Sequence, residues 1–358
     1  MKICALTRHE LFVVLIAAIL AGCAAGSSAA PPVGGADIRR ALALSNPVGL
    51  VPAQRIARQQ SWISPQWRSA LGNAHKLKGK VLWGADLEYG ALEAYDYKTG
   101  ALIGEVPGFS YPYGLCSDSN GDVYVSDFSN EEGAEIQAGT FNIIKTWPTG
   151  GEAIGCSVSK SGDVSFTNFY PGGVVVFPGG GPTGTTYSGP GYDWPAGYDK
   201  NGSLFVECNY VSPCSSPHLA ELVSGSWQFL NFDQSIAFPA AVQGGAPDIG
   251  VADQNYNFAD TTAIYWTSIS GSNAHAVRTY NMEGSGCSSY MDDSSSWGSL
   301  AKQHANGVQI KKVKGVAAAN LWCFPSPINI YGKKGGTPAS TISVLTYQYD
   351  YGVTFTSP

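Results

Sequence analysis

Four polar side chains with oxygen atoms lie at the ends of successive β-like runs: Asp127, Asn168, Glu207 and Asp253. Carboxylate and amide oxygens are ligands that Ca²⁺ prefers, and a carboxylate beside a metal-bound water can act as a general base. If the four side chains converge, they predict a site for Ca²⁺ or Zn²⁺ with hydrolytic chemistry. If they bond to turn amides instead, they are structural. The sequence leaves both interpretations open.

Aromatic side chains gather just before other β-like runs. Aromatic rings stack on sugars and aromatic ligands and pack against protein partners, so they are candidates for ligand binding. The alternative interpretation is that the rings fill space between neighbouring elements. The candidates are Tyr111, Tyr113, Trp194, Phe238 and Tyr351.

A repeat supplies the elements that carry these residues. A turn between two β-like runs recurs at Gly121, Gly162 and Gly202, with spacings of 41 and 40 residues. A period near 40 with four short β-like runs per unit is typical of β-propeller blades. In such a fold, the loops before the first run and after the second run emerge on one rim. We therefore expect the aromatic and oxygen-bearing candidates to lie on the same rim.

The two ends of the repeat region complete each other. The first unit begins at Lys80 with a run that matches the second strand of a blade, and Tyr351 opens a run that matches a first strand. Pairing these two runs leaves no free sheet edge between the ends. We predict an all-β fold over residues 79–358, a six-bladed β-propeller closed by pairing of its C-terminal strand with the N-terminal blade.

The segment from Pro112 to Asp127 reads Pro-Tyr-Gly-Leu-x-x-Asp-x-x-Gly-Asp-Val-Tyr-Val-Ser-Asp and resembles NHL-type propeller repeats. From about residue 79 onward, the chain is similar to uncharacterised bacterial lipoprotein propellers. The lactonase-like senescence-marker-30 family is an enzymatic relative of this group. The resemblance implies a six-bladed propeller, and it leaves the function open because the fold hosts both binders and enzymes.

The N-terminus resembles a lipoprotein signal. Lys2 and Arg8 precede a short apolar run, which ends in Leu20-Ala-Gly-Cys23. A cationic start, a short apolar core and small residues before a cleavage site mark a secretory signal. We expect a signal peptide over 1–22, acylation of the Cys23 sulfur, and a tether with an N-terminal extension over 23–78.

Besides Cys4 and Cys23, six cysteines remain, and an even number in an exported chain suggests disulfides. Cys208 and Cys214 lie close together, and we predict that they are bridged. Aligning Gly121 with Gly162 places Cys116 beside Ser157, so Cys116 and Cys156 point to opposite strand faces unless a bulge intervenes.

The formal net charge of −6 and the 13% of charged residues disfavour nucleic-acid binding, which needs clustered Lys and Arg. We expect an exported, lipid-anchored binding module at the outer membrane or cell surface, without a cofactor or a metal. It would touch the membrane only through its anchor and bind a protein, glycan or cell-wall ligand. The alternative is a lactonase-like hydrolase that uses Ca²⁺ or Zn²⁺ at the channel mouth.

Overall fold

The computed structural model describes the residue ranges 80–87, 89–189, 192–193, 196–209, 218–234, 239–246, 248–254, 261–283, 297–299, 308–309, 315–319, 327–332, 334–343 and 350–356. The chain divides into two compact units, Met1–Trp62 and Ile63–Pro358. All described residues belong to the second unit. The predicted signal peptide, Cys23 and tether lie outside them.

The first three sheets contain four strands each and are built from antiparallel neighbours. Valine, isoleucine and aromatic residues are frequent in these strands, and turns containing glycine separate several of them, a pattern that favours short paired strands. The first sheet has the order β27-β1-β2-β3, the second β4-β5-β6-β7 and the third β11-β10-β9-β8. Their strands are β1 (Val81–Asp86), β2 (Ala91–Asp96), β3 (Leu102–Pro107), β4 (Pro112–Ser117), β5 (Val123–Asp127), β6 (Glu132–Ile136), β7 (Ile143–Pro148), β8 (Ala153–Val158), β9 (Val164–Asn168), β10 (Val174–Phe177), β11 (Thr185–Tyr187) and β27 (Asp350–Thr356).

The other three sheets are less regular. The fourth has the order β12-β14-β15-β16 with β13 also paired to β14, the fifth β17-β21-β20-β19-β18-β23, and the sixth β22-β24-β25-β26. Their strands are β12 (Tyr192–Asp193), β13 (Gly197–Tyr198), β14 (Leu204–Asn209), β15 (His218–Val223), β16 (Ser226–Phe229), β17 (Asn231–Phe232), β18 (Pro239–Ala246), β19 (Ile249–Gln254), β20 (Thr261–Ser270), β21 (Asn273–Glu283), β22 (Trp297–Ser299), β23 (Val308–Gln309), β24 (Gly315–Ala319), β25 (Pro327–Gly332) and β26 (Ser340–Ser343). The described residues include one short 3-10 helix, η2 (Pro178–Gly180), and no α-helix.

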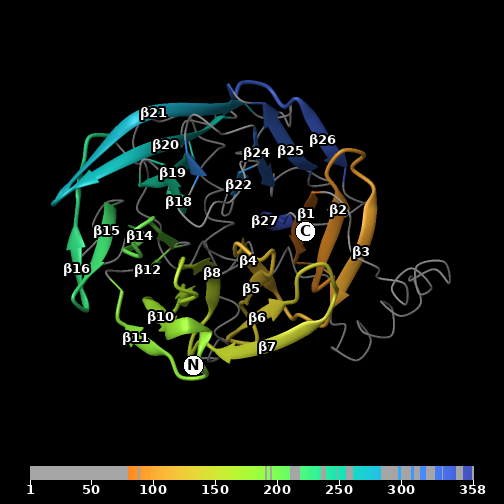
Figure 1. Cartoon of the computed structure of the whole chain (residues 1–358), viewed down its shortest axis with the longest axis horizontal. Helices are drawn as coiled ribbons and strands as arrows, with labels where there is room; N and C mark the ends of the chain where they lie inside the picture. Colours follow the sequence, from red (N-terminus) through yellow and green to blue (C-terminus); the bar gives the residue numbers. More distant parts are fainter. Residues whose placement is uncertain are drawn as a thin grey trace, which may run out of the picture. The chain divides into compact units, whose positions relative to one another are not determined.

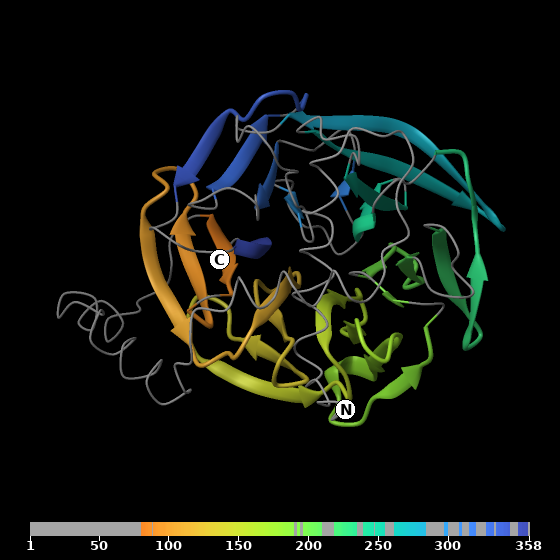
Figure 2. The ribbon, with the colours of Figure 1, turned by 180° about the vertical axis from the view of Figure 1, so that it is seen from behind.

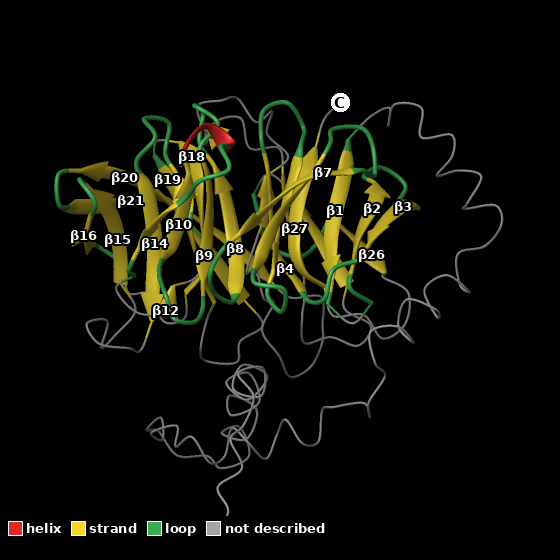
Figure 3. Ribbon diagram, turned by 90° about the horizontal axis from the view of Figure 1, so that it is seen from below, coloured by secondary structure: helices red, strands yellow, loops and turns green. Residues whose placement is uncertain are grey.

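Within the unit from Ile63 to Pro358, the sheets are arranged radially about a common axis, and each sheet runs from an inner strand to an outer one (Figures 1 and 2). The strands run roughly along this axis, so the loops collect on two rims (Figure 3). The expectation of an all-β propeller is confirmed. The C-terminal strand β27 pairs with β1, and Val81 faces Thr356 in their register.

Packing between sheets explains which strands are buried along their whole length. Every residue of the second strands β1, β5 and β9 is buried, because both faces of these strands are covered by neighbouring sheets. The sheets approach closely where glycine leaves room. A Cβ atom on Gly133 of β6 would lie 2.0 Å from the Phe166 ring of β9. A Cβ atom on Gly114 of β4 would lie 2.5 Å from the carbonyl oxygen of Ile154 on β8.

Candidate functional site

Asp127 holds a rim loop in place. It is the last residue of β5 and is fully buried. Its carboxylate accepts hydrogen bonds from the backbone N–H of Ser110 at 2.8 Å and of Tyr111 at 2.9 Å. The side-chain amide of Asn130 donates a third bond at 2.8 Å. Burial raises the pKa of the Asp127 carboxyl, and the two backbone hydrogen bonds partly oppose this shift. Asp127 therefore binds turn amides, as one of the two interpretations expected.

Further hydrogen bonds link the rim loops of the first sheet to those of the second. We define the rim as the loops after β1, β5 and β9 and before β4 and β8, within residues 86–90, 108–111, 127–132, 149–152 and 168–173. The Gly90 carbonyl accepts bonds from the N–H groups of Gly108 at 3.2 Å and Phe109 at 3.0 Å. Asp127 then connects this segment to the loop after β5.

The same linkage continues into the third sheet. The Thr149 N–H donates to the carbonyl of Glu131 at 2.9 Å. The Asn168 side-chain amide donates to the carbonyl of Thr149 at 2.9 Å, and the Glu152 N–H donates to that of Tyr170 at 2.9 Å. One hydrogen-bonded surface thus extends across the rim loops of three successive sheets.

Asn168 is only 2% exposed, and its place at the end of β9 matches that of Asp127 at the end of β5. Both residues face the first residue of the neighbouring inner strand, Ala153 and Pro112. Asp253 faces Pro239 of β18 in the same way, and its side chain lies outside the described residues.

Glu207 does not share this position. Phe205 pairs with Gly197 in the fourth sheet as Tyr124 pairs with Cys116 in the second. Glu207 therefore corresponds to Ser126, and Cys208 corresponds to Asp127. Since neighbouring residues of a strand point to opposite faces, the fully buried Glu207 faces away from the Asp127 side. In the sequence, Glu207 resembles Asp127 because both lie near the end of a β-like run.

The aromatic candidates have different environments. Tyr113 is fully buried, and its ring centroid lies 6.3 Å from that of Phe128. Tyr111 is half-buried and lies 6.2 Å from the same ring. Tyr351 belongs to β27, and its side chain lies outside the described residues, as do Trp194 and Phe238.

The structure adds two tyrosines that sequence reasoning missed. Tyr89 is 46% exposed and Tyr170 is 42% exposed. Tyr89 follows Asp86 by three residues, and Tyr170 follows Asn168 by two, so both belong to loops after second strands. The signal available in the sequence was an aromatic residue shortly after each rim acid or amide. These rings are the exposed aromatic groups of the rim in the described part of the chain.

The structure forms a disulfide between Cys116 and Cys156, whose Cα atoms lie 5.7 Å apart. The predicted bridge from Cys208 to Cys214 falls outside the described side chains. Among the described residues, no three His, Cys, Asp or Glu side chains form a group that could hold a metal ion. No helix among them is long and apolar enough to cross a membrane.

Comparison with known proteins agrees with this geometry. Residues 109–131 match the NHL repeat. The fold is a β-propeller, and this segment of it is similar to the NHL repeat. The matched segment includes β4 with the buried Tyr113, β5, and the rim residues Tyr111 and Asp127. No curated protein matches the sequence significantly.

Solved propeller structures share the fold at low sequence identity. A structure described as the nidogen/laminin complex has 12% identity and a TM-score of 0.53, and the match covers 78% of this chain and 98% of that one. A Bacteroides caccae protein of unknown function also has 12% identity and a TM-score of 0.53, over 78% of this chain and 100% of that one. TolB from Acinetobacter baumannii has 13% identity and a TM-score of 0.50, over 91% of this chain and 74% of that one.

Proposed function

We propose that this propeller is an exported, lipid-anchored binding module of the cell envelope that recognises a protein, glycan or cell-wall ligand through its rim. The observation that carries the proposal is the hydrogen-bonded rim of three sheets with Tyr89 and Tyr170 exposed on it. Loops held in one arrangement lose little conformational entropy on binding, which favours affinity. Exposed tyrosines supply large contact areas at interfaces.

The anchor is supported by the Leu-Ala-Gly-Cys23 motif after a short apolar run. Expression with labelled palmitate tests it. We expect label on the full chain and none on Cys23→Ala, because the acylated sulfur is then absent. Equal labelling of the two proteins would refute the anchor.

Binding is tested with the full chain carrying Cys23→Ala, so that it can be purified without detergent. The probes are purified cell-wall sacculi and an array of defined glycans. We expect binding that the pair Tyr89→Ala and Tyr170→Ala weakens at least about tenfold, since truncating an interface aromatic often costs more than about 1 kcal/mol.

Phe229→Ala is the matched control, because Phe229 is 39% exposed on the outermost strand β16 and lies outside the rim. The control should bind as the parent does. A rim variant that binds as tightly as the parent, or a control that loses binding equally, would reject the rim as the binding surface.

A further inference from the structure

One position of the inner strand contacts the next sheet at three successive interfaces. The second strands β1, β5 and β9 end at Asp86, Asp127 and Asn168. We define the crossing position as the inner-strand residue that pairs with the residue three positions before this end. It is occupied by Thr354 in β27, opposite Trp83, by Cys116 in β4, opposite Tyr124, and by Ser157 in β8, opposite Ser165.

Each crossing residue reaches forward to the next inner strand. The hydroxyl of Thr354 lies 2.9 Å from that of Ser117 in the second sheet. The hydroxyl of Ser157 accepts a hydrogen bond from the N–H of Tyr198 in the fourth sheet at 3.2 Å. Between these two contacts, Cys116 is joined to Cys156 of the third sheet. A covalent bond thus stands where the neighbouring interfaces have hydrogen bonds.

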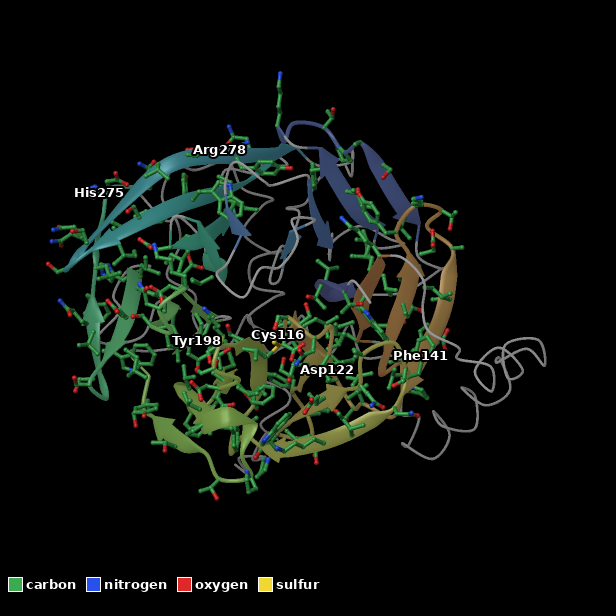
Figure 4. All side chains as sticks on the ribbon, viewed as in Figure 1. Cys116, Asp122, Phe141, Tyr198, His275 and Arg278 are labelled. Carbon is green, nitrogen blue, oxygen red and sulfur yellow. A yellow bond between two sulfur atoms is a disulfide. The ribbon has the colours of Figure 1, made fainter. Side chains whose placement is uncertain are left out.

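The strand register explains how two cysteines of similar repeats can meet. Cys116 faces Tyr124, whereas Cys156 faces Phe166, which is one residue farther along the repeat. The two side chains therefore point to opposite faces of their own sheets. Opposite faces of two adjacent sheets are the faces that meet in a propeller, so the pair spans the interface. Figure 4 shows Cys116 at the inner strands, close to β8.

The bridge lies beside a packed apolar interface. Cys156 is 6% exposed and belongs to a buried cluster with Tyr124 and Trp147 of the second sheet and Phe166 of the third. Gly114 and Gly133 allow the two sheets to approach at this interface. The two cysteines are 40 residues apart and lie on different sheets, and the packing of β4 beside β8 brings their sulfur atoms together.

We propose that the Cys116–Cys156 bridge is a covalent lock on the interface between the second and third sheets, and that it closes after these sheets have packed. The two thiols lose two protons and two electrons as the S–S bond forms. The oxidant is a small-molecule or protein disulfide, which accepts the two electrons and two protons and is released as two thiols.

The lock is tested first by removing it. The double variant Cys116→Ser and Cys156→Ser replaces the bridge with the side chain that the third sheet has naturally at its crossing position, Ser157. We expect a Tm lower by about 5–10 °C, since a bridge that closes a long loop stabilises strongly. Non-reducing peptide mapping should show the linked pair in the parent. Free thiols at both positions, or an unchanged Tm, would overturn the proposal.

The order of events is tested at a residue that does not carry sulfur. Gly133→Ala places a methyl group against the Phe166 ring and should hold the two sheets apart. We expect this variant to form the bridge more slowly than the parent during refolding in a glutathione buffer, as measured by thiol trapping.

Gly332→Ala is the control for this experiment, because a Cβ atom there would have no neighbour within 4 Å. The control should form the bridge at the parent's rate. A bridge that forms equally fast in Gly133→Ala would show that sulfur pairing does not depend on sheet packing.

The crossing position also predicts where a new bridge can form. Ala196 precedes Gly197 as Cys156 precedes Ser157, and Gly197 faces Phe205 in the corresponding register. In the double-serine background, Ser157→Cys with Ala196→Cys should therefore give a linked pair between the third and fourth sheets. Two free thiols in this folded variant would contradict the rule that the crossing residue faces the next sheet.

Discussion

Asp127 shows what a buried carboxyl does in this rim. Its oxygens accept hydrogen bonds from two backbone N–H groups of the segment that leads from the first sheet into β4 of its own sheet. A buried N–H without a partner is costly, so the carboxylate stabilises a loop that has no strand partner at this point. Asp96 has a similar role in an exposed turn, where it accepts bonds from the N–H groups of Lys98 at 3.0 Å and Thr99 at 2.8 Å.

The pKa directions of these two carboxyls predict opposite effects of pH. Burial raises the pKa of Asp127 above 3.8, so the folded state holds a proton that the unfolded chain has lost as pH rises past 3.8. The free energy of unfolding then falls with rising pH in this window. Asp127→Asn should make the fall of Tm above pH 3.8 less steep. Thermal unfolding over a pH series measures this slope.

Asp96 is the control for the sign. The backbone hydrogen bond from Thr99 is the main cause that lowers the pKa of Asp96 below 3.8. The Asp96 carboxylate therefore adds to the free energy of unfolding above pH 3.8, and this stabilisation is lost as pH falls through the lowered pKa. Asp96→Asn should therefore flatten the acid side of the curve only. Identical changes of slope in the two variants would refute the assignment.

At the scale of the elements, a bulge recurs in the outer strands. One extra residue interrupts the pairing of the third and fourth strands in three sheets, at the same place in each repeat. The extra residues are Ile103, Ile144 and Val277. Ile144 is 51% exposed and Val277 is 53% exposed. A bulge twists an edge strand and makes it a poor template for pairing with another chain.

Deleting Ile144 should expose a regular edge on β7. The deletion joins Ile143 to Lys145, which already face Ile136 and Glu135, so the ladder with β6 becomes continuous. We expect the variant to self-associate with increasing concentration in sedimentation velocity experiments. Ile144→Thr keeps the bulge and should sediment as the parent does. Equal sedimentation of the deletion and the parent would show that the bulge does not protect this edge.

At the scale of the whole molecule, the last strand connects the two ends of the propeller. β27 pairs with β1, and the Trp83 side-chain N–H donates to the Thr356 hydroxyl at 3.1 Å. Val353 is fully buried in a cluster that also contains Leu82 of β1 and Ile328 of β25. This one strand therefore belongs to the packing of the first and sixth sheets together.

Removing residues 350–358 should destabilise the whole unit. The first sheet loses its inner strand, and β1 is left with an open edge, so we expect a loss of about 5 kcal/mol or more in the free energy of unfolding. Urea denaturation measures it, and removal of residues 357–358 alone is the control.

A milder variant covers the case in which the truncated chain does not fold. Thr354→Val removes the hydrogen bond to Ser117 and should cost about 1 kcal/mol. A truncated chain as stable as the parent would show that β27 does not support the propeller.

The repeat, the propeller and the pairing of its two ends were predictable from the amino-acid sequence. Turns at Gly121 and Gly162 mark the hairpins. The first repeat lacks a first strand and the C-terminal segment supplies one, so the two ends were expected to pair. The sequence also indicated that Cys116 and Cys156 point to opposite faces, and the register confirms this.

Which candidate side chains reach solvent, and which face each other, depends on how the sheets pack. Alternation along a strand assigns residues to two faces, but both faces of β5 and β9 are buried between sheets, so alternation cannot identify the solvent side. Tyr113 of β4 is in the core, while Tyr89 and Tyr170, which lie in loops, are exposed on the rim. The carboxyl of Asp127 proved to be a loop support, because only the packed structure brings the Ser110 and Tyr111 amides within reach.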